Sequence, residues 1–387
     1  MIKVVDLFSG AGGLTFGFQK KISRNRFVED NRFKVVFANE FDHSAAETFR
    51  INYPNIPLIE EDISKLDTEY LTKLSLDISD IDLVIGGPPC QSFSTVGKRQ
   101  YDNRAKMYKE YRRMLSILKP KIFVFENVLG LLTMKNDLGS PVIDDVEKSF
   151  SDFSDFKDSL SYTIHKKILN SEDFGVPQSR KRVFLVGVRT DLQIEHKWEF
   201  PAVDNKRSLV TVKEAIGDLP PLENGSSTSF YQRAPFTRYQ FLMRGKQKKL
   251  YNHENGNNGE RILQIMQAVP EGKGRPYINN LVENGQLPKE LYLTSGYRNT
   301  YGRLWWNKPA TTITNNLSTP SSLRCIHPKQ NRALTPREGA RLQSFPDSFL
   351  FTGPKGKINS QIGNAVPPIL SMNLADSIYK FINKNFN

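Results

Sequence analysis

The chain has 387 residues, with 54 Lys or Arg against 41 Asp or Glu and a formal net charge of +13. That length suffices for two domains, or for one domain with a large insertion. The sequence contains no apolar run of membrane-spanning length and opens on a strand pattern rather than a signal peptide, so we expect neither a membrane span nor secretion.

Two cysteines, Cys90 and Cys325, are too few and too far apart for a disulfide framework or a Cys-rich zinc site. We therefore expect no metal centre and a reducing, cytoplasmic environment. The excess of positive charge favours a polyanionic partner, because basic surfaces neutralise phosphates and release counterions. Charge alone does not separate DNA from RNA, or either one from simple solubility.

An apolar strand over residues 3–8 opens the chain and runs into Ser-Gly-Ala-Gly-Gly at 9–13, where a helix begins near Leu14. A strand, a glycine loop and a helix form the first step of a nucleotide-binding α/β fold, since glycines let a ligand approach the backbone closely. Many cofactors use such loops, so this signal names no particular ligand.

The next strands predict the other half of a cofactor site. A second strand over 34–38 ends at Glu40, whose carboxylate is placed to bind both ribose hydroxyls, while Phe41 beside it is placed to stack on adenine. The alternative for Glu40 is a simple surface carboxylate. Asp62 and Ile63 follow the third strand and are expected to border the adenine.

A fourth strand over 82–86 leads into Gly-Gly-Pro-Pro, which stops the strand and forces a rigid loop. Cys90 is the first reactive side chain after this stop. Ligands gather at the carboxyl ends of strands in an open α/β sheet, so a thiol held there is a candidate nucleophile. The alternative is a buried structural cysteine.

Glu126 follows a fifth strand over 122–125, which comes after a helix whose apolar residues span 104–118. We expect its carboxylate one strand along from Cys90, although a salt-bridge role is as common for a lone glutamate. Residues 136–161 are acidic and Ser-rich, which indicates a solvated helix or loop.

Two further strands are predicted over 162–169 and 183–188, with a turn before the second that carries three alternating polar side chains. Gln178, Arg180 and Arg182 share one face of an extended segment and are expected to point into a cleft.

The α/β alternation stops near residue 191, and Pro, Gly, Asn, Ser and aromatic residues become frequent. Between residues 231 and 251, Lys and Arg alternate with Tyr and Phe, a pattern that suits contacts to nucleic-acid backbone and bases. An irregular small domain with a wet surface is the alternative. A helix over 337–343 and a final helix over 369–386, preceded by Pro-Pro, complete the chain.

Six segments resemble the motifs of the cytosine-C5 methyltransferases that use S-adenosylmethionine, and they come in that family's order. They are Phe-Ser-Gly-Ala-Gly-Gly at 8–13, Pro-Pro-Cys-Gln at 88–91, Glu-Asn-Val at 126–128, Gln-Ser-Arg-Lys-Arg at 178–182, Arg-Glu-Gly-Ala-Arg-Leu-Gln at 337–343 and Gln-Ile-Gly-Asn-Ala-Val-Pro-Pro at 361–368. The resemblance implies a doubly wound, Rossmann-like catalytic domain over 1–190 plus 355–387. A smaller, irregular, β-rich target-recognition domain is expected over 191–354.

The resemblance also implies roles for single residues. Cys90 would add to C6 of a flipped-out cytosine, Glu126 would bind the N3 and N4 edge and place a proton at N3, Arg180 would hold O2, and Arg182 would support them. The positions that match the family's S-adenosylmethionine site are Phe8, Gly10, Gly12, Gly13, Leu14, Glu40, Phe41, Asp62, Ile63, Pro88, Asn364 and Val366.

The expected activity is methyl transfer to C5 of cytosine in a specific duplex DNA sequence by a monomeric bacterial enzyme of restriction–modification type. A cognate restriction endonuclease acting on the same site is a further expected partner. Two alternatives stay open: a tRNA cytosine methyltransferase of the same family, and an inactive DNA-binding relative. The basic region after Arg182 favours DNA, and the presence of Cys90, Glu126 and Arg180 argues against an inactive protein.

Overall fold

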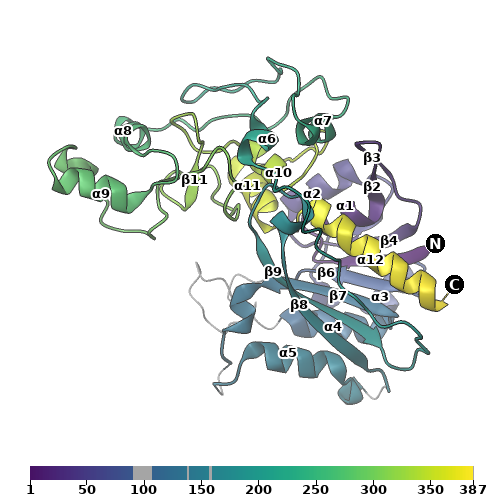
Figure 1. The fold of residues 1–387 in the computed structure, drawn as a ribbon. Helices are drawn as coiled ribbons and strands as arrows, with labels where there is room; N and C mark the ends of the chain where they lie inside the picture. Colours follow the sequence, from purple (N-terminus) through teal and green to yellow (C-terminus); the bar gives the residue numbers. More distant parts are fainter. Residues whose placement is uncertain (90–106, 137–138, 157–158, 387) are drawn as a thin grey trace.

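The computed structural model describes residues 1–89, 107–136, 139–156 and 159–386. Its centre is a seven-stranded sheet (Figure 1) in the order β5-β4-β1-β6-β7-β9-β8. The strands are β1 (Ile2–Leu7), β4 (Phe33–Asn39), β5 (Leu58–Ile59), β6 (Leu83–Gly86), β7 (Ile122–Val128), β8 (Tyr162–Asn170) and β9 (Lys181–Arg189). The five strands from β5 to β7 run parallel, and β9 and β8 follow antiparallel. This is the α/β sheet that the sequence predicts.

Alternate residues of each strand enter two separate cores, because successive side chains of a strand point to opposite faces. On one face, Val4 and Val124 pack with helices α1 (Gly13–Gln19) and α12 (Pro368–Phe386). On the other face, Val5 and Phe123 pack with α4 (Met107–Leu118) and α5 (Val142–Ser151). The C-terminal helix α12 therefore packs on the sheet that contains the N-terminal strand β1, as Figure 1 shows.

One further helix packs on each face of the sheet, Phe49 of the first helix in the core with Val4 and Leu71 of the second in the core with Val5. These helices are α2 (His43–Asn52), which follows β4, and α3 (Thr68–Lys73), which follows β5. Within the acidic stretch that the sequence assigns to solvent, α5 buries one apolar face with Val142, Val146 and Phe150, so that expectation is wrong for this helix. Val142, Val146 and Phe150 are four residues apart and therefore share one face of the helix, although acidic residues lie between them in the sequence.

Residues 191–354, all of which the structure describes, contain more helix than strand, so the prediction of a β-rich region is corrected. Their helices are α6 (Val212–Ile216), α7 (Arg238–Arg244), α8 (Glu260–Ala268), α9 (Arg275–Glu283) and α10 (Pro336–Leu342), and their strands are β10 (Gly302–Arg303) and β11 (Arg324–Ile326). Frequent Pro, Gly and aromatic residues mark irregular backbone, which is what joins these short elements, but they do not distinguish strand from helix.

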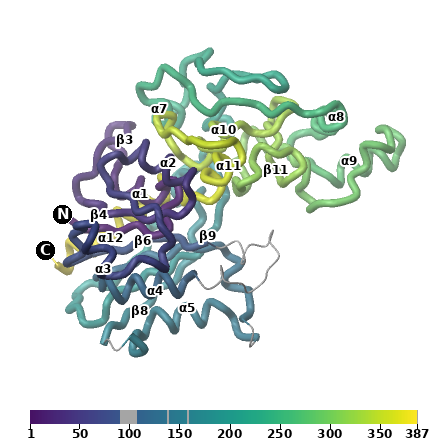
Figure 2. Tube along the Cα trace, turned by 180° about the vertical axis from the view of Figure 1, so that it is seen from behind, coloured from purple at the N-terminus to yellow at the C-terminus, as the bar shows by residue number. Residues whose placement is uncertain are grey.

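The helices α8 and α9 belong to a projecting part of the chain, residues 260–303 together with 324–326, which we call the α8–α9 lobe. It has its own apolar core, which includes Ile265, Ile278 and Tyr301. Figure 2 shows the lobe at one side of the molecule and the hairpin of β2 (Lys20–Ser23) and β3 (Arg26–Glu29) at the opposite side. The sequence analysis did not predict this hairpin.

A buried network of charges fixes α10 between the sheet and the lobe. The Arg341 guanidinium pairs with Asp218 and with Asp347, and Arg332 pairs with Glu338 at 2.7 Å. Leu334, Leu342 and Phe345 meanwhile share the core that contains Val4 and Val124. The apolar core therefore crosses the predicted boundary at residue 354, and the domain limits stay predictions.

Among the described residues, no helix combines the length and apolar character needed to cross a bilayer. The same residues bring together no group of three or more His, Cys, Asp or Glu side chains suited to a metal ion.

Strand β9 allows a direct test of this sheet. The ring of Phe123 on β7 occupies the space in which residue 187 would carry a Cβ, 2.0 Å away, and Phe123 is fully buried among other rings. Gly187→Ala should therefore lower the free energy of unfolding by about 1–3 kcal/mol, as expected for overpacking. Denaturant unfolding measures this change.

Gly356→Ala is the matched control, because residue 356 lies in α11 (Lys355–Asn364) with open space around the added methyl. It should leave stability unchanged or slightly higher. Equal effects of the two substitutions would contradict the packing of β7 on β9.

Candidate active site

The loop after β1 has an unusual backbone. Phe8, Gly10 and Gly12 all have positive φ, of 57°, 57° and 89°. For phenylalanine this left-handed conformation costs roughly 1–2 kcal/mol, so the surrounding structure must hold it. An added Cβ at Gly10 would meet no atom within 4 Å, which leaves this part of the loop open.

Glu40, at the end of β4, links two strand ends. One carboxylate oxygen accepts the Gly10 N–H at 2.8 Å and the other accepts the Asp42 N–H at 2.7 Å. Burial raises the pKa of Glu40, and these backbone donors oppose part of the rise. Phe41 beside it is 70% exposed, a large ring left uncovered next to the carboxylate. Glu40 and Phe41, which are predicted to bind ribose and adenine, are therefore adjacent to the glycine loop.

Asp62 and Ile63 lie just beyond β5, one strand further along. Asp62 caps the short helix Ile63–Lys65 by accepting the Ser64 N–H at 2.9 Å, and Ile63 is buried. The strand itself ends earlier than predicted, at Ile59. Strands β1, β4 and β5 thus deliver Phe8, Glu40 and Asp62 to the same edge of the sheet.

The C-terminal motif, residues 361–368, and the helix after it pack against the glycine loop. A Cβ at Gly13 would lie 2.4 Å from the carbonyl oxygen of Val366, and the hydroxyl of Ser371 donates to the carbonyl of Leu14 at 2.6 Å. Asn364, at the end of α11, is exposed beside this contact. Gly12 in turn leaves room for the ring of Tyr53. The contact between Leu14 and Ser371 joins positions 357 residues apart in sequence.

Glu126 is the centre of the second half of the site. It lies within β7 rather than after it, because β7 pairs with antiparallel β9 as far as Val128. Its side chain forms an ion pair with Arg182 of β9, with 3.1 Å between Oε1 and Nε. A Cβ at Gly87 would meet the other Glu126 oxygen at 2.8 Å, so the loop after β6 passes directly beside the carboxylate.

Glu126 is only 8% exposed, and burial raises the pKa of its carboxyl group. The positive charges of Arg182 and Arg180 oppose part of this rise. The arrangement is a desolvated acid paired with one cation near the carboxyl-terminal end of β7. This environment is typical of general acid and base groups.

Arg180 is 1% exposed and holds two other segments in place. Its guanidinium donates to the carbonyl of Ile313 at 3.1 Å and to the carbonyl of Gly363 at 2.9 Å. Gln178 is also buried: it accepts the Ile313 N–H and donates to the side chain of Gln343. Gln178 and Arg180 therefore both bond the backbone of Ile313, and of the three predicted polar residues only Arg182, which lies in β9, pairs with Glu126.

Cys90 lies outside the described residues, so its predicted place beside Glu126 stays a prediction. The backbone leading to it is described as far as residue 89, and the carbonyl of Pro88 accepts a hydrogen bond from Asn127 at 3.4 Å. Because β6 and β7 are adjacent, the segment that leads to Cys90 begins one strand from Glu126.

Two buried groups near the glycine loop were not predicted. Among the described atoms, Ser9 Oγ and one carboxylate oxygen of Asp6 have no hydrogen-bond partner. The other Asp6 oxygen accepts the Thr15 hydroxyl. The signal was present in the sequence, because Asp6 is an acid between the apolar residues Val5 and Leu7 of the first strand.

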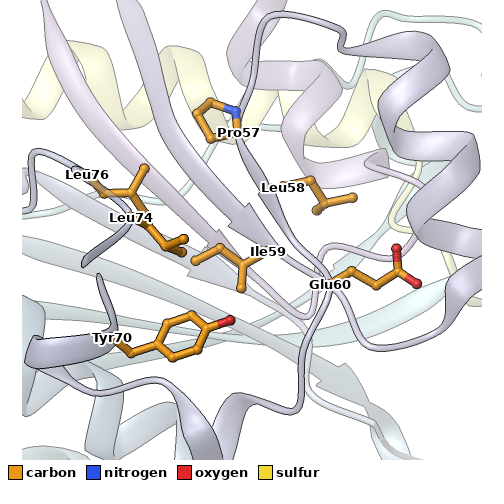
Figure 3. A pocket seen from close by; sticks show the side chains of 7 residues that line it. All are labelled: Pro57, Leu58, Ile59, Glu60, Tyr70, Leu74 and Leu76. Atoms are coloured by element: carbon orange, nitrogen blue, oxygen red, sulfur yellow. The ribbon is translucent and has the colours of Figure 1, made fainter. Parts of the chain in front are cut away.

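A hollow of about 320 Å³ elsewhere in the molecule contains none of the predicted site residues (Figure 3). It is lined by Pro57, Leu58, Ile59, Glu60, Tyr70, Leu74 and Leu76 at the outer edge of β5. Glu60 pairs with His43 and Arg50 instead of with any group in the hollow. The site is therefore defined by the strand ends and not by this surface depression.

The model of a family described as C-5 cytosine-specific DNA methylase matches residues 2–380. The Type II methyltransferase M.DdeI of Desulfomicrobium norvegicum is 34% identical, over 97% of this chain and 88% of its own. The Type II methyltransferase M1.HphI of Haemophilus parahaemolyticus is 32% identical, over 97% and 86%.

Solved structures give the same picture. A prophage-encoded E. coli protein, described as a DNA modification methyltransferase, superposes with a TM-score of 0.73 at 26% identity over 99% of this chain and 100% of its own. The S. pombe Dnmt2 methyltransferase superposes with a TM-score of 0.60 over 99% and 100%, and its 15% identity supports the fold alone.

Asp6 makes stability depend on pH. Burial raises its pKa from 3.8 to about 7, so folding favours the protonated acid. This contribution is complete below pH 3.8 and is lost as the pH rises through about 7. Relative to Asp6→Asn, which cannot ionise, the wild-type protein should lose on the order of 1–4 kcal/mol between pH 5 and 8. Urea unfolding across this range measures the slope.

Asp30→Asn is the control, because Asp30 pairs with Arg32 and its pKa is lowered in the folded chain. Its stability contribution is lost only in acid, so the difference from wild type should stay flat over the same range. A flat difference for Asp6→Asn as well would contradict the buried, half-partnered acid.

Proposed function

Because this chain belongs to the C-5 cytosine-specific DNA methylase family, we propose that it modifies a flipped-out cytosine in duplex DNA through a covalent bond to Cys90. It is a DNA cytosine-5 methyltransferase, and its relatives favour a Type II restriction–modification role. The observation that carries the mechanism is the buried Glu126–Arg182 pair beside the backbone of Gly87.

The chemistry needs a covalent step because C5 of cytosine is a poor nucleophile. The Cys90 thiolate forms a bond to C6, N3 receives a proton, and C5 becomes enamine-like. After C5 has gained the methyl group, it loses its proton to a base, the bond from sulfur to C6 breaks and the thiolate returns. N3 gives its proton back in the same stage, so neutral 5-methylcytosine leaves. One difficult step is thereby divided into two easier ones.

Glu126 is suited to supply the proton at N3. Its burial keeps the carboxyl protonated at higher pH than an exposed glutamate, and a protonated carboxyl donates a hydrogen bond where a carboxylate only accepts. Arg182 fixes the carboxyl from the neighbouring strand. We assign Arg182 as a positioning residue.

Arg180 is the proposed donor to O2 of the base. Its bonds to Ile313 and Gly363 tie the segment between β10 and β11 and the end of α11 to the same guanidinium. A positive charge fixed in a buried place stabilises negative charge that develops on the ring.

The residues at the glycine loop fit S-adenosylmethionine. The fit rests on the open space at Gly10, the anchored carboxylate of Glu40, the exposed ring of Phe41 and the unpartnered buried Ser9 Oγ. When bound, this cofactor supplies an electrophilic methyl group. The proposed contacts are those of the motif positions: Phe8, Gly10, Gly12, Gly13, Leu14, Glu40, Phe41, Asp62, Ile63, Pro88, Asn364 and Val366.

Duplex DNA hides C5 and C6 in the base stack, so the target base must leave the helix at a cost of a few kcal/mol. Phosphate contacts from a chain of net charge +13 offset part of this cost. We propose a monomer that shares its target sequence with a restriction endonuclease.

A trapping experiment tests the covalent step. With 5-fluorocytosine in the DNA, C5 carries no proton to lose after methylation, so the sulfur–C6 bond persists. Duplexes in which every cytosine is fluorinated, incubated with S-adenosylmethionine, should give a protein–DNA complex that survives denaturing electrophoresis. Cys90→Ser should give none.

A complex formed equally by Cys90→Ser would reject Cys90 as the nucleophile. Normal methylation of unmodified DNA without any trapping would reject the adduct. Methyl transfer to tRNA but not to duplex DNA would replace the substrate, and no transfer to either would favour the inactive relative.

Glu126→Gln tests the proton donor. The amide keeps the size of the side chain but cannot transfer a proton to N3, so kcat should fall by roughly 10²–10⁴-fold. Wild-type kcat/KM should also decline as the pH rises through the raised pKa of Glu126, because only the protonated acid acts, and the variant should lack this alkaline decline. Steady-state methylation of duplex DNA from pH 5.5 to 9 measures both.

Glu29→Gln, which alters an exposed pair with Lys20, is the control and should leave kcat unchanged. A Glu126→Gln enzyme with a near wild-type rate and pH profile would remove Glu126 from the reaction.

A further inference from the structure

The α8–α9 lobe uses its arginines unevenly. Five arginines lie between residues 261 and 324, and four of them donate to backbone carbonyls. Arg261 bonds Glu290, and Arg275 bonds Gly296. Two others complete the set: Arg303 bonds Val269 and His327, and Arg324 bonds Lys273. These four hold the lobe together.

Arg298 is the exception. Its side chain is exposed, and among the described residues no hydrogen bond, ion pair or ring contact involves it. A guanidinium offers five N–H donors in a rigid fork, so Arg298 presents a complete recognition group to solvent.

The segment that carries Arg298 is firmly anchored at both ends. Residues 294–299 are all exposed, whereas Leu293 before them and Tyr301 after them belong to the apolar core of the lobe. Asn279 clamps Leu293 with two hydrogen bonds, of 2.9 and 3.0 Å. The loop thus has fixed ends and an exposed tip that contains Tyr297, Arg298 and Asn299.

The chain that follows this loop runs to the candidate active site. From β10, the chain continues to Ala310, which pairs with Gln178, and to Ile313, which accepts a hydrogen bond from Arg180. Figure 1 shows α10 and α11 between the sheet and the lobe. The backbone therefore connects a contact made by the loop to the residues proposed to surround the target base.

The basic and aromatic stretch over 231–251 is the competing surface. Its helix α7 lies on the other side of the molecule, because Asn25 at the tip of the β2–β3 hairpin bonds the carbonyl of Arg238 at 3.2 Å. Figures 1 and 2 both show this hairpin opposite the α8–α9 lobe. Its cations suit phosphate contacts rather than base contacts next to the target.

We propose that Arg298 is a specificity-determining residue that binds a guanine of the recognition sequence through the major groove, with residues 294–299 as the base-reading loop. An arginine pairs in bidentate fashion with O6 and N7 of guanine, which is the commonest specific contact in protein–DNA complexes. This inference rests on the proposed function, since it needs duplex DNA as substrate.

Methylation of random-sequence duplex DNA, read out by sequencing of methylated cytosines, tests the assignment. The wild type should methylate cytosines within one sequence that contains a fixed guanine besides the one paired to the target. Arg298→Ala should reduce the preference at that one position by roughly 10- to 100-fold and leave the other positions unchanged. Arg298→Gln should shift that position toward adenine, because glutamine pairs with N6 and N7 of adenine.

Arg238→Ala is the matched control: an exposed arginine on the opposite surface, whose loss should leave the methylated sequence unchanged. A thermal melt of each variant checks that the exposed substitutions leave the fold intact. An unaltered sequence preference in both Arg298 variants would overturn the inference, and so would a uniform loss of affinity on all sequences, which marks a phosphate contact. If the wild type modifies no DNA, the proposed function itself fails.

Discussion

The ion pair between Glu126 and Arg182 occupies the one place in the sheet where parallel strands give way to antiparallel ones. Parallel β6 and β7 deliver the thiol-bearing loop and the carboxyl group to one edge, and antiparallel β9 returns an arginine to the same edge. Glu126 and Arg182 are diagonal neighbours on one face, because Arg182 stands opposite Val128. The strand order thus creates a buried acid with a cation beside it and leaves Gly87 against its second oxygen.

The remaining parts of the site are held by contacts between distant segments. Val366 covers Gly13, and Arg180 joins residues 313 and 363 to the turn before β9. The cofactor half and the base half therefore share structural support from the C-terminal motif. A change at one of these contacts is expected to disturb both binding and chemistry, whereas Arg298 in the lobe is expected to affect only sequence choice.

Local pattern was enough to predict most of the sheet and the approach of Glu40 to the glycine loop, since apolar runs and Gly-rich turns are features of neighbouring residues. Local pattern was not enough to predict strand ends and burial that depend on residues far away in sequence. Strand β7 extends through Glu126 because β9 pairs with it, and one face of α5 is buried because it meets the rings on β7. The regular elements of residues 191–354 are mainly short helices rather than strands. The bonds of Arg180 to Ile313 and Gly363 likewise have no local signature.

The central claim is that the Glu126 carboxyl group, at the strand edge beside Arg182, binds the pyrimidine that is modified. A crystal structure of the protein with its duplex target and a non-reactive cofactor analogue tests it most directly. The account predicts an extruded cytosine whose N3 or N4 lies about 2.6–3.2 Å from a Glu126 oxygen. A target base that stays stacked in the duplex, or that is extruded but contacts other side chains while Glu126 remains paired only with Arg182, would contradict it.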